Sequence, residues 1–171
     1  MNNGGSVAGL VVPAEGLEET RPAAASAGIT RGVCRLFSDI GYRVVVELPL
    51  GNRRRVDVAA VDRAGGIAVI EVKASVADYR SDGKWREYRP YCDRFYFAVA
   101  PEFPRHVLPD DVGIVVADAF QGAVVRDAPE HAMNAARRKA VTVRFARTAA
   151  ARLQGLLDRP AGAYRSALRM P

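Results

Sequence analysis

Alternating apolar and polar positions are clearest in the middle of the chain. Residues 53–61 and 67–73 are rich in β-branched side chains and flank a short segment that ends in two glycines. This pattern predicts two strands joined by a glycine-containing turn. If the hairpin is symmetric about Ala64, Asp57 faces Glu71 across the two strands.

The predicted hairpin brings two carboxylates together. Directly opposed residues have Cβ atoms about 5 Å apart, so Asp57 and Glu71 would repel each other without a cation between them. Lys73 lies on the same face, about 7 Å further along the strand. The pattern therefore predicts a divalent metal site with an adjacent ammonium group. No histidine or cysteine lies near these residues in the sequence, which favours Mg²⁺, or Mn²⁺, over zinc.

The elements around the hairpin predict a single α/β domain with a central mixed sheet flanked by helices. Apolar residues at helical spacing predict a helix from Arg31 to about Ile40, with Thr30 as its cap. A β-branched run predicts a strand before the hairpin, with Glu47 near its end as a possible third acid beside the metal. That strand is expected at residues 42–48, and three further strands are expected at residues 94–100, 112–117 and 123–126.

The segment after Lys73 predicts two short helical pieces. Ser75 and Asp78 have the spacing of a capping box, and Ser81 is expected to cap the second piece. The second piece carries an aromatic stripe that is more typical of a core than of a base-stacking platform, formed by Trp85, Tyr88 and Cys92. Asp82 and Lys84 are polar and close to the predicted site, so both are possible accessory residues.

The last segment is strongly basic. Between Arg137 and Arg159 there are seven cations and one acid, the charge pattern of a nucleic-acid contact. Residues 141–145 alternate, and an alanine-rich helix is expected to follow to about Leu157. We expect a disordered leader at 1–27, a domain at 28–158 and a frayed tail at 159–171.

Composition indicates the partner and the compartment. The net charge is +6 and the pI about 9.7, which suggests a polyanionic partner. The two cysteines form neither a disulfide framework nor a zinc pattern, so a reducing interior is expected. No apolar run could span a bilayer, and the first residues lack the basic region of a secretory signal. These features lead us to expect a soluble cytoplasmic protein.

His106 and His131 have no ligand spacing and are expected in loops or on the surface.

Asp57 followed by Glu71-Val72-Lys73 resembles the motif of the PD-(D/E)XK nuclease superfamily, whose restriction-endonuclease-like core runs helix, three strands, helix, strand. The resemblance implies that Asp57 and Glu71 bind the metal, that the Val72 carbonyl adds a ligand, and that Lys73 is the catalytic cation. Two positions depart from the common pattern. Val56 replaces the usual proline, and the first helix has Arg31 and Arg35 where many members carry a glutamate.

A longer set of segments resembles the MmcB family of bacterial DNA repair proteins. The resemblance covers about residues 28–158 and implies repair of DNA damage, crosslinks in particular, in the bacterial cytoplasm, with nucleoid association while the protein is engaged. It is carried by 54–58, 71–75, 81–85 with Tyr88, 91–93, 97–100 and 137–141.

Three functions remain open from the sequence. The first is a Mg²⁺-dependent endonuclease or exonuclease that acts on damaged or branched DNA. The second is a DNA-binding repair factor with the same fold and little or no activity, and the third is an interaction scaffold. Two clusters are candidate nucleic-acid contacts, although the first could also be a solvated edge: Arg53, Arg54 and Arg55, and Arg137, Arg138 and Lys139.

Overall fold

A six-stranded mixed sheet forms the centre of the protein. The computed structural model describes residues 20–158, with side chains from residue 23. The strands lie in chain order across the sheet, with β1 and β6 at its edges. They are β1 (Arg43–Pro49), β2 (Arg55–Val61), β3 (Ile67–Lys73), β4 (Arg94–Val99), β5 (Gly113–Ala117) and β6 (Gly122–Arg126). The strands expected from the sequence are thus confirmed, within one or two residues at their ends.

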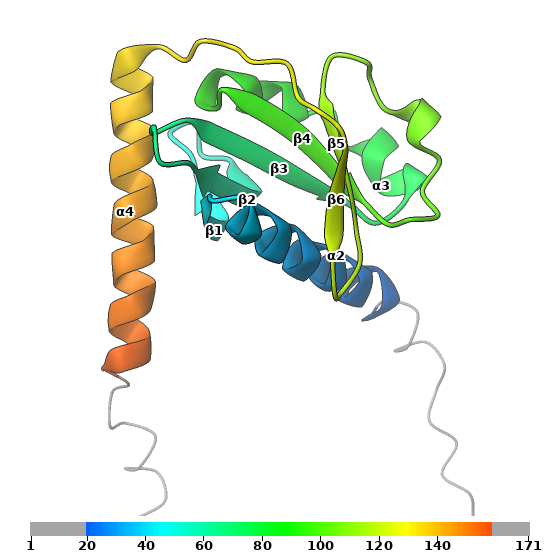
Figure 1. Cartoon of the computed structure of the whole chain (residues 1–171), viewed down its shortest axis with the longest axis horizontal. Helices are drawn as coiled ribbons and strands as arrows, with labels where there is room; N and C mark the ends of the chain where they lie inside the picture. Colours follow the sequence, from blue (N-terminus) through cyan, green and yellow to red (C-terminus); the bar gives the residue numbers. More distant parts are fainter. Residues whose placement is uncertain (1–19, 159–171) are drawn as a thin grey trace, which may run out of the picture.

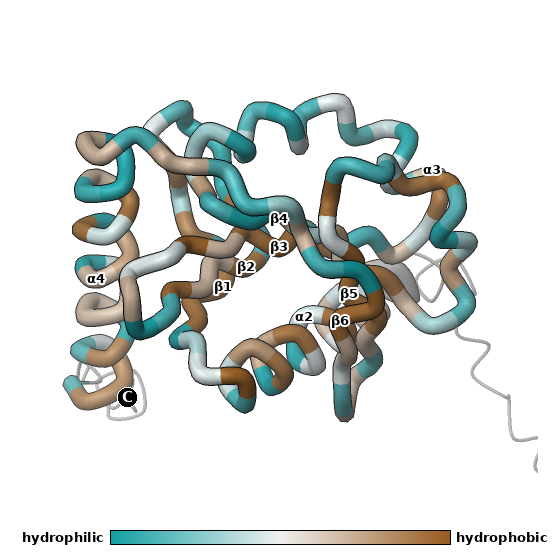
Figure 2. Tube along the Cα trace, turned by 45° about the horizontal axis from the view of Figure 1, so that its top comes forward, coloured by the Kyte–Doolittle hydropathy of each residue, from teal (hydrophilic) through white to brown (hydrophobic). Residues whose placement is uncertain are grey.

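The helices lie on both faces and beside one edge of the sheet (Figure 1). Helix α2 (Thr20–Asp39) crosses one face, and α3 (Val76–Ser81) and the 3₁₀ helix η1 (Trp85–Tyr91) connect β3 to β4. A 3₁₀ turn, η2 (Arg105–Val107), lies between β4 and β5, and α4 (Ala135–Leu157) runs alongside β1. Hydrophobic residues concentrate on the central strands (Figure 2), and β3 and β4 are almost wholly buried between the helices on the two faces.

The central hairpin has the symmetric register expected from its sequence. Val58 pairs with Ile70 and Val61 with Ile67, both symmetric about Ala64. The turn is closed by Asp62, whose Oδ1 accepts hydrogen bonds from the backbone N–H groups of Ala64 and Gly66, both at 2.8 Å. This side-chain cap fixes the turn and therefore the register of both strands.

Strands β3, β4 and β5 are parallel, whereas β1, β2 and β6 pair antiparallel with their neighbours. The order α2, three antiparallel strands, α3, then a parallel strand is that of the restriction-endonuclease-like core. This confirms the fold class expected from the sequence. Parallel strands cannot be joined by a tight turn and need a crossover connection, which α3 and η1 supply between β3 and β4.

Helix α2 is longer than the sequence pattern predicts. It begins at Thr20, so the predicted start at Arg31 is wrong and the predicted domain boundary at residue 28 falls inside a helix. The buried stripe of Ile29, Val33 and Phe37 packs on the sheet. Gly32 permits the close approach, because a Cβ there would lie 2.3 Å from the Asp118 carbonyl oxygen. The rest of the predicted leader, residues 1–19, lies outside the described residues.

The two short helical pieces pack on the other face. Ser75 caps α3 by accepting a hydrogen bond from the Asp78 N–H at 3.1 Å, as expected. Ser81 does not cap η1, which follows Lys84 and has no side-chain cap; Ser81 instead donates to the Asp78 carbonyl within α3. Trp85 and Tyr88 are buried against Phe95, so the predicted core role of the aromatic stripe is confirmed.

Helix α4 is one continuous helix, so the alternating segment 141–145 belongs to it rather than preceding it. Asn134 caps its start by accepting from two backbone N–H groups. In a strand, Val141 and Val143 would share one face. In the helix they point to different sides, so Val141 is buried and Val143 is 48 % exposed. No helix within residues 20–158 is long and apolar enough to cross a membrane. The predicted tail at 159–171 lies outside the described residues.

Candidate active site

Asp57 lies where β2 and β3 stop pairing. The ladder between these strands ends at Val58 and Ile70, one residue before Asp57 and Glu71. The Asp57 carboxylate fills this opening, and its Oδ2 accepts a hydrogen bond from the Val72 N–H at 2.8 Å. Burial raises the pKa of Asp57, and this effect outweighs the hydrogen bond from Val72 and the charge of Lys73, which lower it.

Glu71 is the most unusual acid among the described residues. Its side chain is buried, and its Oε2 has no hydrogen-bond partner within residues 20–158. Burial, followed by the nearby charge of Asp57, raises the pKa of Glu71 to about 8. A buried carboxylate oxygen without a partner is costly, and a bound cation would remove that cost.

Lys73 lies beside Glu71 and is held in place by Asp82. Its Nζ is 2.5 Å from Asp82 Oδ2 and 3.6 Å from Glu71 Oε1. Burial lowers the pKa of Lys73, but the hydrogen bond to Asp82 and the charge of Glu71 outweigh it, and the net shift is upward. The same contact keeps the pKa of Asp82 low despite its partial burial. The group therefore carries a charged ammonium at the edge of the carboxylate pair.

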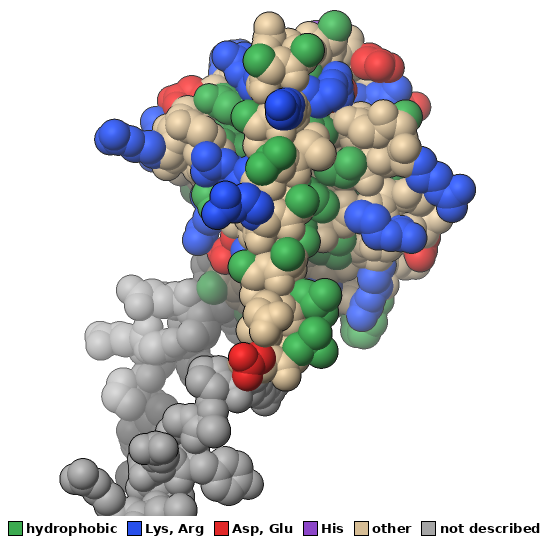
Figure 3. Space-filling model, turned by 90° about the vertical axis from the view of Figure 1, so that its left-hand side faces the viewer, with side chains coloured by type: hydrophobic (Ala, Val, Ile, Leu, Met, Phe, Trp, Pro, Cys, Tyr) green, Lys and Arg blue, Asp and Glu red, His purple; other side chains and the backbone are tan. Residues whose placement is uncertain are grey.

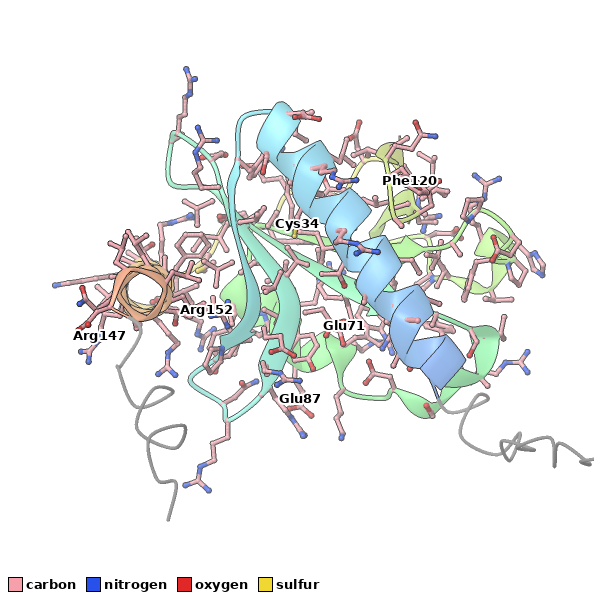
Figure 4. All side chains as sticks on the ribbon, turned by 90° about the horizontal axis from the view of Figure 1, so that it is seen from below. Cys34, Glu71, Glu87, Phe120, Arg147 and Arg152 are labelled. Carbon is pink, nitrogen blue, oxygen red and sulfur yellow. The ribbon has the colours of Figure 1, made fainter. Side chains whose placement is uncertain are left out.

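These residues border a cavity of about 850 Å³ between the strand ends and α2. Figure 4 shows Glu71 on the sheet beneath α2, which passes across it and carries Cys34. From α2 the lining includes Thr30, Arg31 and Arg35, and from the sheet it includes Asp57, Glu71, Val72 and Lys73. The three predicted core residues of the site are thus together, and the cations of α2 border the same space.

The described part of the chain holds no group of three or more histidine, cysteine, aspartate or glutamate side chains placed to bind a metal. The donors available at the predicted centre are therefore the Asp57 and Glu71 carboxylates. A backbone carbonyl such as that of Val72 would be a further oxygen donor of the kind Mg²⁺ accepts. The donor set is hard and all oxygen, and it fits Mg²⁺ or Mn²⁺ with bound waters completing the shell.

The possible accessory residues have different positions. Glu47 borders the cavity, and its backbone has a φ of +49°, but its carboxylate pairs with Arg55 at 3.2 Å. Asp82 acts on Lys73, as described. Lys84 is exposed and does not border the cavity. The structure thus brings Glu47 and Asp82 to the site and leaves Lys84 outside it.

The first arginine cluster is largely engaged with neighbouring acids. Arg54 makes a two-pronged ion pair with Glu87, at 2.9 and 3.0 Å, while Arg55 pairs with Glu47. Arg53 is exposed and has a φ of +65°. Arg54 and Arg55 are thus paired with acids, whereas Arg53 makes no ion pair among the described residues.

The second cluster opens α4 and is partly structural. Arg138 donates to both oxygens of Asp93, at 2.7 and 2.6 Å, and to the Gly65 carbonyl at 3.0 Å. Arg137 lies over the Tyr91 ring, 5.1 Å from its centroid, and Lys139 is exposed. Arg138 thus fastens the start of α4 to the sheet, which sequence spacing could not reveal because Asp93 is far away in the chain.

Replacing Arg138 with alanine should lower the stability of the fold. Buried Asp93 would lose its charged partner, and a buried acceptor left without a partner costs about 1–3 kcal/mol; the partial exposure of Arg138 keeps the loss in this range. Chemical denaturation of Arg138→Ala against Lys139→Ala, the exposed neighbouring cation, measures the difference. Equal stability of the two variants would contradict a structural role for Arg138.

Comparison with known proteins identifies the family. A model of the family described as DNA repair protein MmcB-like matches residues 14–160. The chain belongs to the MmcB-like DNA repair protein family. A search of curated proteins finds no match. The family match supports the sequence resemblance, and it extends through the part of α2 that the sequence pattern missed.

Two solved structures are similar to this chain. A protein of unknown function from Silicibacter pomeroyi is 41 % identical, with a TM-score of 0.77 over 79 % of this chain and 92 % of that one. This MmcB-like chain therefore shares its fold with that protein. A repair endonuclease from Pyrococcus abyssi is 23 % identical over 39 % of this chain and 32 % of that one, with a TM-score of 0.28.

Proposed function

We propose that the protein is a Mg²⁺- or Mn²⁺-dependent nuclease that hydrolyses phosphodiester bonds of damaged or branched DNA. The observation that carries the proposal is Glu71, a buried carboxylate with one unpartnered oxygen, beside Asp57 at the open end of a strand pair. A cation is the ligand that would relieve both the desolvation and the repulsion of this pair. Membership of a DNA repair family supports DNA as the substrate.

The residues divide the chemistry between them. A divalent cation at the carboxylates would acidify its bound water and neutralise charge on a phosphate oxygen. Asp57 and Glu71 bind it from two neighbouring strands, so their separation is fixed by the sheet. Lys73 places an ammonium beside Glu71, where it stabilises negative charge that develops on the reacting phosphate. Asp82 positions that ammonium and keeps it charged.

The cavity of about 850 Å³ is bordered by cations that suit phosphate groups. Its border on α2 includes Arg31 and Arg35. Arg35 uses one nitrogen to bind the carbonyls of Ala119 and Phe120, at 2.8 and 3.0 Å. Arg35 retains further donors, and both arginines border the cavity that holds the two carboxylates. Phosphate oxygens are the acceptors that guanidinium groups bind best.

A DNA-binding repair factor without cleavage is the second candidate. The ion pairs of Lys73 favour this candidate, because its ammonium already lies 2.5 Å from the Asp82 carboxylate and 3.6 Å from that of Glu71. In that case, the buried group would be a structural ion cluster, and DNA binding would persist when Asp57 is replaced. The two candidates therefore differ in metal binding and in cleavage, while both bind DNA.

Calorimetric titration with Mn²⁺ tests the metal site directly. The wild-type protein should bind one Mn²⁺ at the carboxylate pair, and Glu71→Gln should weaken binding by at least about tenfold, which corresponds to about 1.4 kcal/mol. Because the pKa of Glu71 is about 8, binding at pH 7 should also release close to one proton. Titrations in two buffers of different ionisation enthalpy measure that release.

The matched control is Glu102→Gln, which neutralises an exposed acid away from the cavity. It should bind Mn²⁺ as the wild type does. A Glu71→Gln variant that binds Mn²⁺ with wild-type affinity, or a wild-type protein that binds none, would refute the proposed centre.

A further inference from the structure

A second depression, lined by basic side chains, lies between α4 and the edge strand β1. Its volume is about 690 Å³, and its lining contains no acidic side chain. Helix α4 itself contains no aspartate or glutamate from Ala135 to Leu157. Figure 3 shows Lys and Arg side chains gathered along this helix. We call the depression the α4 groove; its polar residues are Arg144, Arg147, Thr148 and Arg152.

Two of its arginines are held in place by backbone carbonyls of β1 and of Leu50, the residue that follows it. Arg152 donates to the Val46 carbonyl at 2.5 Å, and Arg144 donates to the Leu50 carbonyl at 3.5 Å. These contacts cover the unpaired edge of the sheet and fix both guanidinium groups. An arginine has five N–H donors, so each retains donors for another ligand.

Arg147 is exposed and lies between these two arginines along the helix axis, but about 140° around the helix from Arg152, so the two line opposite flanks of the α4 groove. It has no hydrogen bond or ion pair among the described side chains. In Figure 4, Arg147 and Arg152 project from α4, which is seen there nearly end-on. From Arg144 to Arg152 the helix rises about 12 Å, the length of about three to four nucleotides of one strand.

The α4 groove adjoins the candidate active site through β1. Val46 and Glu47 border the cavity, and their carbonyls accept hydrogen bonds from Arg152 at 2.5 and 3.4 Å. A chain of phosphates leaving the cavity across β1 would therefore meet the groove. We propose that the α4 groove binds the phosphate backbone of the DNA whose reactive segment occupies the cavity, and this inference rests on the proposed function.

The chemistry of the groove favours a nucleic-acid backbone over an acidic protein. Its lining combines guanidinium groups, a hydroxyl and small side chains, which are the groups that contact phosphates without reading sequence. It contains no aromatic residue, so it offers no platform on which bases could stack and would contact the backbone alone. Binding here should therefore depend on salt and be insensitive to base sequence.

Fluorescence anisotropy with a labelled duplex of about 20 base pairs, in EDTA at several NaCl concentrations, tests the groove. Each phosphate contact contributes about 0.9 to the slope of log K against log salt for duplex DNA. Arg147→Ala should lower that slope by about 0.9, and Arg147→Glu should weaken binding further. The matched control pair is Arg63→Ala and Arg63→Glu, which alter an exposed arginine in the β2–β3 turn.

The proposal that the α4 groove binds DNA is contradicted if the Arg147 variants have the same DNA affinity and the same salt dependence as the Arg63 variants. The same result, accompanied by loss of binding to an acidic polypeptide such as polyglutamate, would assign the groove to a protein partner instead. Because EDTA removes the metal, this test does not depend on cleavage. If the protein never cuts DNA but Arg147→Ala lowers the salt dependence of DNA binding, the proposed nuclease activity is refuted and the proposed DNA-binding role of the α4 groove stands.

Discussion

Replacing Lys73 with alanine should abolish metal-dependent DNA cleavage, with a loss of at least about 100-fold in the single-turnover rate. The ammonium is buried, lies 3.6 Å from Glu71 Oε1, and is the only lysine bordering the cavity within residues 20–158. No neighbouring cation could take its position, because Arg31 and Arg35 approach from α2. Quenched-flow or gel assays on a flapped DNA, with Mn²⁺ and excess protein, measure the rate.

Two further variants separate chemistry from folding. Asp82→Asn removes the charge that positions Lys73 but leaves the lysine in place, so it should reduce the rate less than Lys73→Ala. Arg63→Ala should leave the rate unchanged. Lys73→Ala should still bind DNA in EDTA, because its loss affects the reacting phosphate and not the backbone contacts. Cleavage by Lys73→Ala at the wild-type rate would eliminate Lys73 from the mechanism.

The metal-free protein should become less stable as the pH rises from about 5 to about 8. The pKa of Glu71 is about 8 in the fold, against an ordinary value of 4.5, so the folded state binds a proton that the unfolded state has lost. Stability then falls with pH throughout this interval and is constant above it. Asp57, whose pKa burial also raises, acts in the same direction.

The size of this effect is large for one side chain. A shift from 4.5 to about 8 corresponds to a few kcal/mol, on the order of 3–5, of unfolding free energy. Urea denaturation at pH 5.5 and pH 8.5, in EDTA, measures it. Glu71→Gln should remove most of the pH dependence and be more stable than the wild type at pH 8.5.

Other groups do not mask this dependence. Asp82 and Asp93 have pKa values below their ordinary values, so the stability that they contribute is lost only at more acid pH. Lys73, with a raised pKa, contributes stability that is lost only at more alkaline pH. A wild-type protein whose stability is flat between pH 5.5 and 8.5 would contradict the buried, unpaired state of Glu71.

Much of the site could be predicted from sequence because it lies on one hairpin. The side-chain period of a strand and the symmetric turn together determine which residues face each other, and the observed pairs from Val61–Ile67 to Val58–Ile70 have the expected register, although pairing stops one residue before Asp57 and Glu71. The same local logic identified the Ser75 cap and the aromatic core. Strands β4, β5 and β6 were recognisable from composition and run length alone.

What the sequence could not predict depends on distant contacts. The first part of α2 is alanine-rich and carries no apolar stripe, and Ala23, Ala24 and Ala25 are exposed, so no burial pattern marks it as a helix in the sequence. The proximity of Arg31 and Arg35 to the cavity follows from how α2 crosses the sheet. Likewise, the role of Arg138 depends on Asp93, and that of Arg152 on the carbonyls of β1.

One assay tests the central claim most directly. Purified protein is incubated with Mn²⁺ or Mg²⁺ and end-labelled single-stranded, flapped and crosslinked DNA, and the products are resolved by electrophoresis beside the Asp57→Asn variant. We expect the wild type to cut at least one of these substrates, EDTA to stop the reaction, and Asp57→Asn to leave the DNA intact. Wild-type protein that binds Mn²⁺ and DNA but leaves all three substrates uncut would contradict the account.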